Sequence, residues 1–190
     1  GTGVQIIELY AFENCTSLTD VTIPDNVRNV SHGAFQGCSG LVNIVISNGV
    51  TKIGDGAFRG CTGLTKVTIP DSVTTIGEEA FEGCTGIKEL TMPVSAKLPT
   101  NGHAAFDCTG IEKITLTKGT GVMCSYTGQT ISADITPFVY TPWYINKDSL
   151  KEIVLEEGIR TISDYAFQGS IGITSFTIPN SVRLIGNYAF

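Results

Sequence analysis

An Ala-Phe pair recurs along this chain, in most places at an interval of 23 residues. The copies are Ala11-Phe12, Ala34-Phe35, Ala57-Phe58, Ala80-Phe81, Ala105-Phe106, Ala166-Phe167 and Ala189-Phe190. Cysteines keep the same step at Cys15, Cys38, Cys61 and Cys84, with Cys108 one residue late. Each cysteine is followed by a frame L-x-x-V-x-I, for example Leu64, Val67 and Ile69. Because no unit of this length can bury its own apolar side, the repeat predicts a solenoid of stacked units.

Each part of the unit predicts a local structure. The V-x-I segment alternates with period 2 and is β-branched, which predicts a short strand. A proline such as Pro70 ends that strand, and Pro70-Asp71 suits a type I turn. The run from Gly77 to Gly83, G-E-E-A-F-E-G, suggests a helical turn with acids near its start and a glycine stop. We therefore expect an α/β solenoid with one short parallel β-strand and a short helix or 3-10 turn per 23-residue repeat.

The full consensus is C-x-x-L-x-x-V-x-I-P-x-x-V-x-x-I-G-x-x-A-F-x-G, and residues 38–60 and 61–83 match it nearly position by position. This pattern resembles the BspA-like leucine-rich repeats, and the resemblance runs from Val4 to Phe190. It implies a right-handed leucine-rich-repeat solenoid, or horseshoe, with the sheet on one face and short helices on the other. It also implies a bacterial or protist protein that is secreted or attached to the cell surface. Members of that class are linked to adhesion to host matrix proteins or to other cells.

We expect residues 1–190 to form a single leucine-rich-repeat domain, with about seven strand-bearing repeats and a partial N-terminal one. Two places break the period: Asn101 stands where an isoleucine is expected, and the stretch from Ile111 to Leu150 is much longer than one repeat. The second break indicates an irregular insertion over about 117–146, which carries Tyr126, Phe138 and Tyr140 among its aromatic residues. The insertion either packs its own aromatics against the solenoid or contacts a ligand, as long irregular loops often do.

The charge balance excludes some classes of partner. The net charge is −6 with a pI near 4.8, and no basic stripe is visible along the sequence, so a nucleic-acid partner is not expected. No apolar run reaches the roughly 18 residues that span a bilayer, so this segment is not expected to insert into a membrane. The chain ends in mid-unit without a polar cap, so we expect more of its own chain or another molecule to cover that end.

The cysteines invite a disulfide or metal interpretation, but five of the six occupy one repeat position. Stacked in that way they form a ladder of small buried side chains, the usual role of a free cysteine. Ser170 takes the same position in a later repeat, which favours a space-filling role. Cysteines in a row also do not surround a metal ion. We expect free thiols and neither a metal site nor a cofactor.

Catalytic candidates are equally weak. Cys124 lies outside the ladder, and a nucleophile there would need a base and an orienting group. The two histidines, His32 and His103, do not repeat and are not tied by sequence to Cys124. Glu78 and Glu79 correspond to variable residues in other repeats, as expected of a solvated surface. We therefore predict no catalytic residue and no enzymatic activity.

In the L-x-x-V-x-I strand, the residues between the apolar ones must point away from the core. The predicted binding surface consists of Asp20, Thr22, Asn43, Val45, Lys66, Thr68, Glu89, Thr91, Lys113, Thr115, Glu152 and Val154. The threonines could simply stabilise an exposed sheet, or the surface could dock an extended protein or glycan, as solenoid sheets do.

The sequence therefore favours a non-enzymatic interaction or adhesion module of a larger surface or secreted bacterial protein. Its predicted partner is a protein or glycan of the host matrix or a cell surface, and its predicted location is extracellular or at the cell surface. One alternative is a structural spacer that presents another domain. A remote alternative is a small-ligand or enzymatic site near the insertion.

Overall fold

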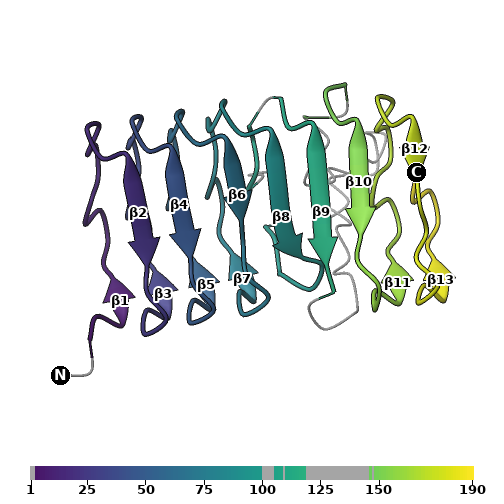
Figure 1. Cartoon of the computed structure of the whole chain (residues 1–190), viewed down its shortest axis with the longest axis horizontal. Coiled ribbons are helices and arrows are strands. Elements are labelled where there is room, and N and C mark those ends of the chain that lie inside the picture. The colour runs from purple at the N-terminus through teal and green to yellow at the C-terminus, as the bar shows by residue number, and fades with distance from the viewer. Residues whose placement is uncertain (1–2, 100–104, 109, 119–145, 147) are drawn as a thin grey trace, which may run out of the picture.

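The structure is a computed structural model that describes residues 3–99, 105–108, 110–118, 146 and 148–190. The backbone winds into coils whose strands form two parallel rows along the molecule (Figure 1). The prediction of a parallel-strand solenoid is confirmed. The N-terminal coils lie at one end of the rows and the C-terminal coils at the other (Figure 1).

Each regular coil carries two strands, whereas the sequence predicted one. The first stack contains the V-x-I strands β2 (Asp20–Ile23), β4 (Asn43–Ile46), β6 (Lys66–Thr68), β8 (Glu89–Pro93), β9 (Lys113–Thr117), β10 (Glu152–Leu155) and β12 (Ser175–Phe176). The second stack contains the shorter strands β1 (Ile6–Ile7), β3 (Asn29–Val30), β5 (Lys52–Ile53), β7 (Thr75–Ile76), β11 (Thr161–Ile162) and β13 (Leu184–Ile185). The additional strands arise from the V-x-x-I pairs after the turn, which the sequence marked only as apolar.

The repeat period sets the register of both stacks. Asp20 pairs with Asn43 in the first stack, and Asn29 pairs with Lys52 in the second, so that each residue meets its equivalent in the next repeat. Residues at the same repeat position therefore lie side by side, about 4.8 Å apart along the molecule. Every repeat position thus becomes a column of side chains.

The predicted insertion leaves the first stack in register. Strands β9 and β10 pair from Lys113 with Glu152 to Leu116 with Leu155, although the predicted insertion separates them in the sequence. Asn146, which is fully buried, stands where the chain rejoins the coils. Its Oδ1 atom accepts hydrogen bonds from the backbone N–H groups of Gly110 and Ile111, both at 3.0 Å. This side chain ties the coil after the insertion to the coil before it.

Replacing Asn146 by alanine should therefore destabilise the fold by about 3 kcal/mol, because the buried N–H group of Ile111 and the half-buried N–H group of Gly110 lose their acceptor. Urea denaturation followed by circular dichroism measures the change. Asn43→Ala is the matched control, since Asn43 is exposed and its side chain donates only to Asp20, at 2.7 Å. Equal losses in the two variants would contradict the role given to Asn146.

The prediction of an α/β fold with a short helix or 3-10 turn in each repeat was wrong: the described residues contain no α-helix, and the Ala-Phe segments form turns. The third residue of the G-x-x-A-F segment is left-handed, as at Gly56 with φ of 56° and Glu79 with φ of 55°. Every second backbone N–H group then points to the next coil, whereas Ala57 N and Arg59 N donate to carbonyls three residues back in the same segment. Phe58 N donates to Ala80 O at 2.8 Å, and Gly60 N donates to Glu82 O at 2.7 Å. Bonds between coils therefore replace the i to i−4 bonds that a helix requires.

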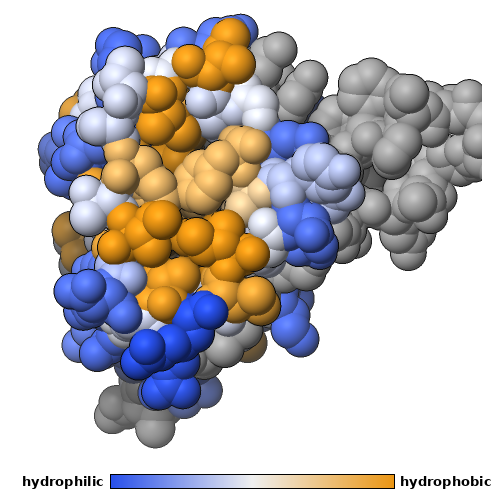
Figure 2. Space-filling view, turned by 90° about the vertical axis from the view of Figure 1, so that its right-hand side faces the viewer, coloured by the Kyte–Doolittle hydropathy of each residue, from blue (hydrophilic) through white to orange (hydrophobic). Residues whose placement is uncertain are grey.

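The apolar repeat positions build one continuous core. Ile69, Ile76 and Phe81 are at most 1% exposed in an interior coil. The same positions at the C-terminal end, Ile178, Ile185 and Phe190, are 49%, 42% and 52% exposed and contribute to the apolar surface visible in Figure 2. Burial of these side chains therefore depends on a neighbouring coil on each side.

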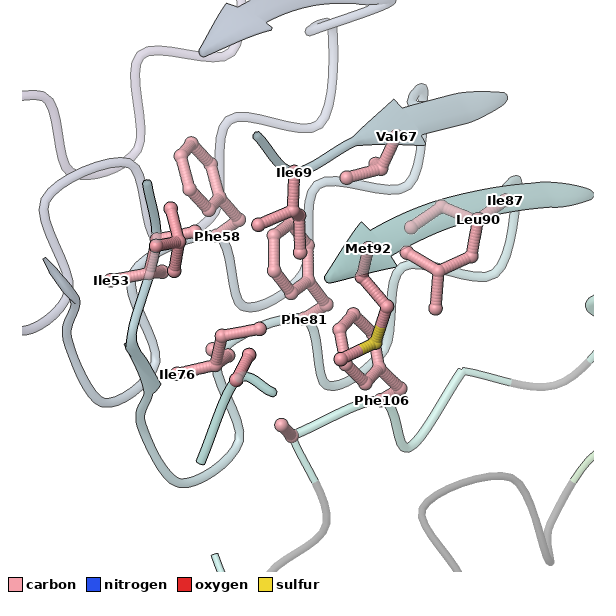
Figure 3. Close-up of a cluster of buried hydrophobic side chains, with 14 of the residues drawn as sticks. Ile53, Phe58, Val67, Ile69, Ile76, Phe81, Ile87, Leu90, Met92 and Phe106 are labelled. Atoms are coloured by element: carbon pink, nitrogen blue, oxygen red, sulfur yellow. The ribbon is translucent and has the colours of Figure 1, made fainter. Parts of the chain in front are cut away.

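Phenylalanine forms the centre of this core. Phe12, Phe35, Phe58, Phe81 and Phe106 stack in a column with ring centroids 5.0 to 5.3 Å apart. Strand residues such as Val67 and Leu90, and Ile53 and Ile76 of the second stack, close around it (Figure 3). The column explains why the Ala-Phe pair is the most regular feature of the sequence.

The cysteines at the shared repeat position are buried, as predicted, in four coils: Cys38, Cys61, Cys84 and Cys108. Cys15 in the first coil is exposed. In three rungs the thiol donates to a phenylalanine carbonyl of the preceding coil: Cys38 to Phe12, Cys61 to Phe35 and Cys84 to Phe58, at 3.0 to 3.1 Å. The rung therefore also links neighbouring coils.

Candidate interaction surface

The outward surface of the first stack, here called the strand face, brings the twelve predicted binding residues together. Strand pairing places Lys66, Glu89, Lys113 and Glu152 in one column. Thr68, Thr91, Thr115 and Val154 form the next. Asp20 and Thr22 of β2 pair with Asn43 and Val45 of β4. These side chains are exposed or half-buried, so all twelve are available on one surface.

The charges on the strand face are paired with one another. Lys66 contacts Glu89 at 3.0 Å, and Lys113 contacts Glu152 at 2.9 Å. The hydrogen bond from Lys66, and then its charge, lowers the pKa of the Glu89 carboxyl. Exposed pairs of this kind contribute little stability, but opposite charges on adjacent strands favour the correct register.

A second charged column, which the sequence interpretation missed, lies beside the first. It contains Lys88, Glu112 and Lys151, and Lys151 contacts Glu112 at 2.6 Å. The signal was present in the sequence as the dipeptides Lys88-Glu89, Glu112-Lys113 and Lys151-Glu152. Across β8, β9 and β10 these dipeptides make an alternating pattern in which each charge is next to its opposite. The two columns together hold three acids and four cations, and with Asp20 of β2 the strand face holds four of each and is electrically neutral.

The column of threonines gives the strand face its polar but uncharged character. Thr68, Thr91 and Thr115 lie on adjacent strands, and Val45 in the same column position is 54% exposed. Val42 on the same strand segment is 42% exposed. A partner docked here would meet hydroxyl and methyl groups flanked by ion pairs.

Near its C-terminal end the strand face is hollowed. The pairing of β10 with β12 ends at Ile153 and Phe176, although β10 continues to Leu155. A cavity of about 290 Å³ opens there, lined by Glu152, Ile153, Val154, Leu155, Glu157, Ser175, Phe176, Thr177 and Pro179. Its acidic residues, Glu152 and Glu157, lie at the rim of an otherwise apolar and hydroxyl-lined hollow.

All five described cysteines are free thiols. Three of the buried ones, Cys38, Cys61 and Cys108, are unsuited to nucleophilic chemistry. Burial, followed by the neighbouring Cys61, raises the pKa of Cys38 to about 11, and burial raises that of Cys108 to about 12. A hydrogen bond with Cys84, then burial, raises the pKa of Cys61 further. These thiols stay protonated at neutral pH, and the thiolate is the reactive form.

The remaining chemical candidates are dispersed. His32 makes an edge-on contact with Tyr10, with ring centroids 5.1 Å apart. Glu79 pairs with Arg59 at 3.0 Å. Within the described ranges no three histidine, cysteine or acidic side chains group as a metal site would require. Nor does any described segment form a helix with the length and hydropathy needed to cross a bilayer. Cys124, His103 and the predicted insertion contacts Tyr126, Phe138 and Tyr140 lie outside the described residues.

Comparison with known proteins agrees with this architecture. A family model for the BspA type leucine rich repeat region matches residues 4–129 and 139–190, in six copies. Among curated protein sequences, none matches the chain significantly.

Several solved structures share the fold. A leucine-rich repeat protein from Eubacterium ventriosum is 26% identical with a TM-score of 0.64, and the match covers 98% of this chain and 45% of that one. The T. pallidum leucine rich repeat protein is 23% identical with a TM-score of 0.57, covering 96% and 67%. The pneumococcal vaccine antigen PcpA is 23% identical with a TM-score of 0.52, covering 98% and 64%. This chain therefore corresponds to only part of each of these proteins.

Proposed function

Because this chain belongs to the BspA-type leucine-rich repeat family, we propose that it is an interaction module that binds a macromolecular partner through the strand face. Leucine-rich repeat proteins of this kind are generally protein-interaction modules and typically not enzymes. The observation that carries the proposal is the strand face itself, a set of exposed columns in register over adjacent parallel strands. Such a surface is extended and polar, and its charges are already neutralised within the chain.

The proposed setting is the cell surface or the extracellular space of a bacterium, where the module would mediate adhesion. The partner is proposed to be a protein or glycan of a host matrix or of another cell. The family and the shared fold with a pneumococcal vaccine antigen support this setting. We also propose that residues 1–190 act as one solenoid domain, and that the insertion contributes contacts through Tyr126, Phe138 and Tyr140.

The exposed apolar residues at the C-terminal end suggest a further contact. Ile178, Ile185 and Phe190 occupy positions that are buried in interior coils, and they share the end surface shown in Figure 2. A further coil of the same repeat pattern would bury all three. We propose that such a coil, from more of the same protein, covers this end.

A structural spacer is the alternative function, and one observation favours it. The ion pairs Lys66–Glu89, Lys113–Glu152 and Lys151–Glu112 show that the charges of the strand face satisfy one another. A surface that serves only to hold neighbouring coils together would also pair its opposite charges across adjacent strands. A small-ligand or enzymatic site near the insertion is not supported by any described side chain.

A binding screen with a paired variant distinguishes the two functions. The chain is tested against purified extracellular-matrix proteins and mucins, together with the double variant Thr68→Arg/Thr115→Arg. Two long cations two strands apart should obstruct the strand face and weaken any specific binding at least tenfold. Ser39→Arg/Thr85→Arg, at exposed turn positions outside both stacks, adds the same charge elsewhere and should leave that binding unchanged. Absence of binding across the whole panel would favour the spacer instead.

A further inference from the structure

Among the described residues, the outward surface of the second stack carries cations and no acids. Five exposed side chains belong to it: Arg28, Lys52, Lys97, Arg160 and Arg183. The segments that form this surface, residues 27–30, 50–53, 73–76, 96–98, 159–162 and 182–185, contain no aspartate or glutamate. We call these five residues the basic stripe. The sequence showed no such stripe because its members are scattered along most of the chain, from Arg28 to Arg183.

Coil stacking aligns the stripe along the molecule. Asn29, Lys52 and Thr75 pair in successive strands, and Thr75 is bridged to Lys97. Lys52 and Lys97 are therefore two rungs apart, roughly 10 Å at the usual strand spacing. Arg160 and Arg183 lie on neighbouring rungs, since Arg183 N donates to Arg160 O at 2.8 Å. In Figure 1 the strands of the second row stand in two groups, β1 to β7 toward the N-terminal end and β11 and β13 toward the C-terminal end.

The cations of the stripe differ from those of the strand face in their partners. On the strand face, Lys66, Lys113 and Lys151 each contact a glutamate within 3.0 Å. In the part of the chain that the structure describes, no member of the basic stripe has a carboxylate partner. Arg28 donates only to the backbone carbonyls of Asp25 and Gly49. Five positive charges are thus presented to solvent without neutralisation, on a protein whose net charge is −6.

Many of the acidic residues lie on a different part of the coil, in the turns that contain the Ala-Phe pair, whereas Asp25, Asp71, Glu156 and Glu157 lie in the turns that lead into the second stack. The turns that contain the Ala-Phe pair hold one cation, Arg59, which is paired with Glu79 and Glu82. The same turns hold eight acids: Glu8, Glu13, Asp55, Glu78, Glu79, Glu82, Asp107 and Asp164. Charge is therefore segregated by coil position, although the chain as a whole is acidic. A polyanion would be attracted along the stripe and repelled from the turns.

We propose that the basic stripe binds a linear polysaccharide that carries carboxylate or sulfate groups, lying along the solenoid axis. The side chains between the cations are small and polar, namely Asn29, Thr51, Thr74, Thr75 and Thr161. They suit contacts with sugar hydroxyl groups. This site is separate from the strand face and goes beyond the proposed interaction function.

Other polyanions fit the stripe less well. Among the described residues between β3 and β11, this surface exposes no large hydrophobic side chain, and Leu184 beside Arg183 is 59% exposed, so anchors of the kind on which a bound peptide depends are few. The described residues between β3 and β11 also present on this surface no exposed aromatic ring of the kind on which bases of single-stranded nucleic acid stack. Duplex DNA carries a charge every ~1.7 Å, far denser than cations that are one or two rungs apart, roughly 5 to 10 Å. A polymer with widely spaced acidic groups matches better, such as one that alternates acidic and neutral sugars.

Binding to hyaluronan, dextran sulfate and uncharged dextran tests the proposal. The chain should bind the two acidic polymers, should not bind dextran, and should bind less tightly as salt is raised. The variant Lys52→Gln/Lys97→Gln should weaken binding about tenfold. The matched control is Lys66→Gln/Lys113→Gln. It also removes two positive charges that are two rungs apart, but from the strand face. It should retain nearly full affinity, because those lysines are already neutralised by Glu89 and Glu152.

Three results would overturn the proposal. The first is an unmodified chain that binds neither acidic polysaccharide. The second is an equal loss in the two double variants, which would indicate that only net charge matters. The third is binding of polyglutamate or duplex DNA as tight as that of hyaluronan. Thermal denaturation of both variants confirms that each remains folded, since all four lysines are exposed or half-buried.

Discussion

Replacing Phe58 by alanine is expected to lower the free energy of unfolding by about 4 kcal/mol. Phe58 is fully buried and stacks between Phe35 and Phe81, with ring centroids 5.3 and 5.1 Å away. Removing the ring leaves a cavity in the middle of the column and takes a neighbour from both adjacent rings. Stacked aromatic pairs contribute about 1 kcal/mol each beyond the burial of their area. Urea denaturation, monitored by circular dichroism, measures the loss.

Phe190→Ala is the matched control, because Phe190 occupies the same repeat position at the C-terminal end. Its side chain is 52% exposed and contacts Phe167 and Phe176 at 5.6 and 4.8 Å. Because only about half of the Phe190 side chain is buried, the free energy of unfolding of this variant should fall by roughly 1 kcal/mol. If Phe58→Ala were no more destabilised than Phe190→Ala, the column would not be the centre of the core.

Replacing Gly77 by alanine, which adds a single methyl group, is expected to lower the free energy of unfolding by about 3 kcal/mol. A Cβ atom at this position would lie 2.3 Å from Asp55 Oδ1 and 2.5 Å from Asp55 N in the preceding coil. Asp55 cannot move away freely, because its Oδ1 atom accepts a hydrogen bond from Glu78 N at 2.9 Å. The Gly77→Ala variant must therefore push two coils apart, with a loss measurable as a lower denaturation midpoint.

Gly56→Ala separates this steric effect from the conformational role of glycine. Gly56 has a φ of 56°, but a Cβ atom there would meet nothing closer than Gln36 Oε1 at 3.6 Å. Glu79 occupies the equivalent position with a φ of 55°, so a side chain is accommodated. The left-handed conformation should cost Gly56→Ala about 1 kcal/mol. A loss in Gly56→Ala as large as that in Gly77→Ala would show that backbone strain, and not coil contact, dominates.

The length of a coil and the direction in which its side chains point were predictable, because both depend only on the spacing of residues in the repeat. The interval between Ala-Phe pairs sets the length of a coil, and the frame L-x-x-V-x-I sets which side chains face inward. The burial of Val67, Ile69 and Phe81 follows from those two patterns. The outward position of Lys66 and Thr68 follows from the same alternation. A repeat makes such inferences strong, since each copy tests the others.

The predicted helix failed for a physical reason that local pattern does not reveal. Acids near the start of G-E-E-A-F-E-G and a glycine at its end suit a helix when only nearby residues are considered. The backbone of the segment instead donates outward, as in Gly56 N to Glu78 O at 2.7 Å. Those acceptors belong to the next coil, a full repeat away in the sequence, and stacking makes their carbonyls available along the whole segment. The tertiary contact therefore overrides the local preference.

By itself, the sequence determined the solenoid, the length of its coil, the apolar columns of its core and the residues of the strand face. Only the tertiary structure decided the second strand of each coil, the pairing of Lys151 with Glu112 and the assembly of the basic stripe. The first group depends on periodicity, which is a property of one repeat copied along the chain. The second depends on which groups of different coils come within hydrogen-bond or ion-pair distance. Arg28, Lys52 and Arg183 become one surface only because coiling brings two neighbouring positions of every repeat to the same side.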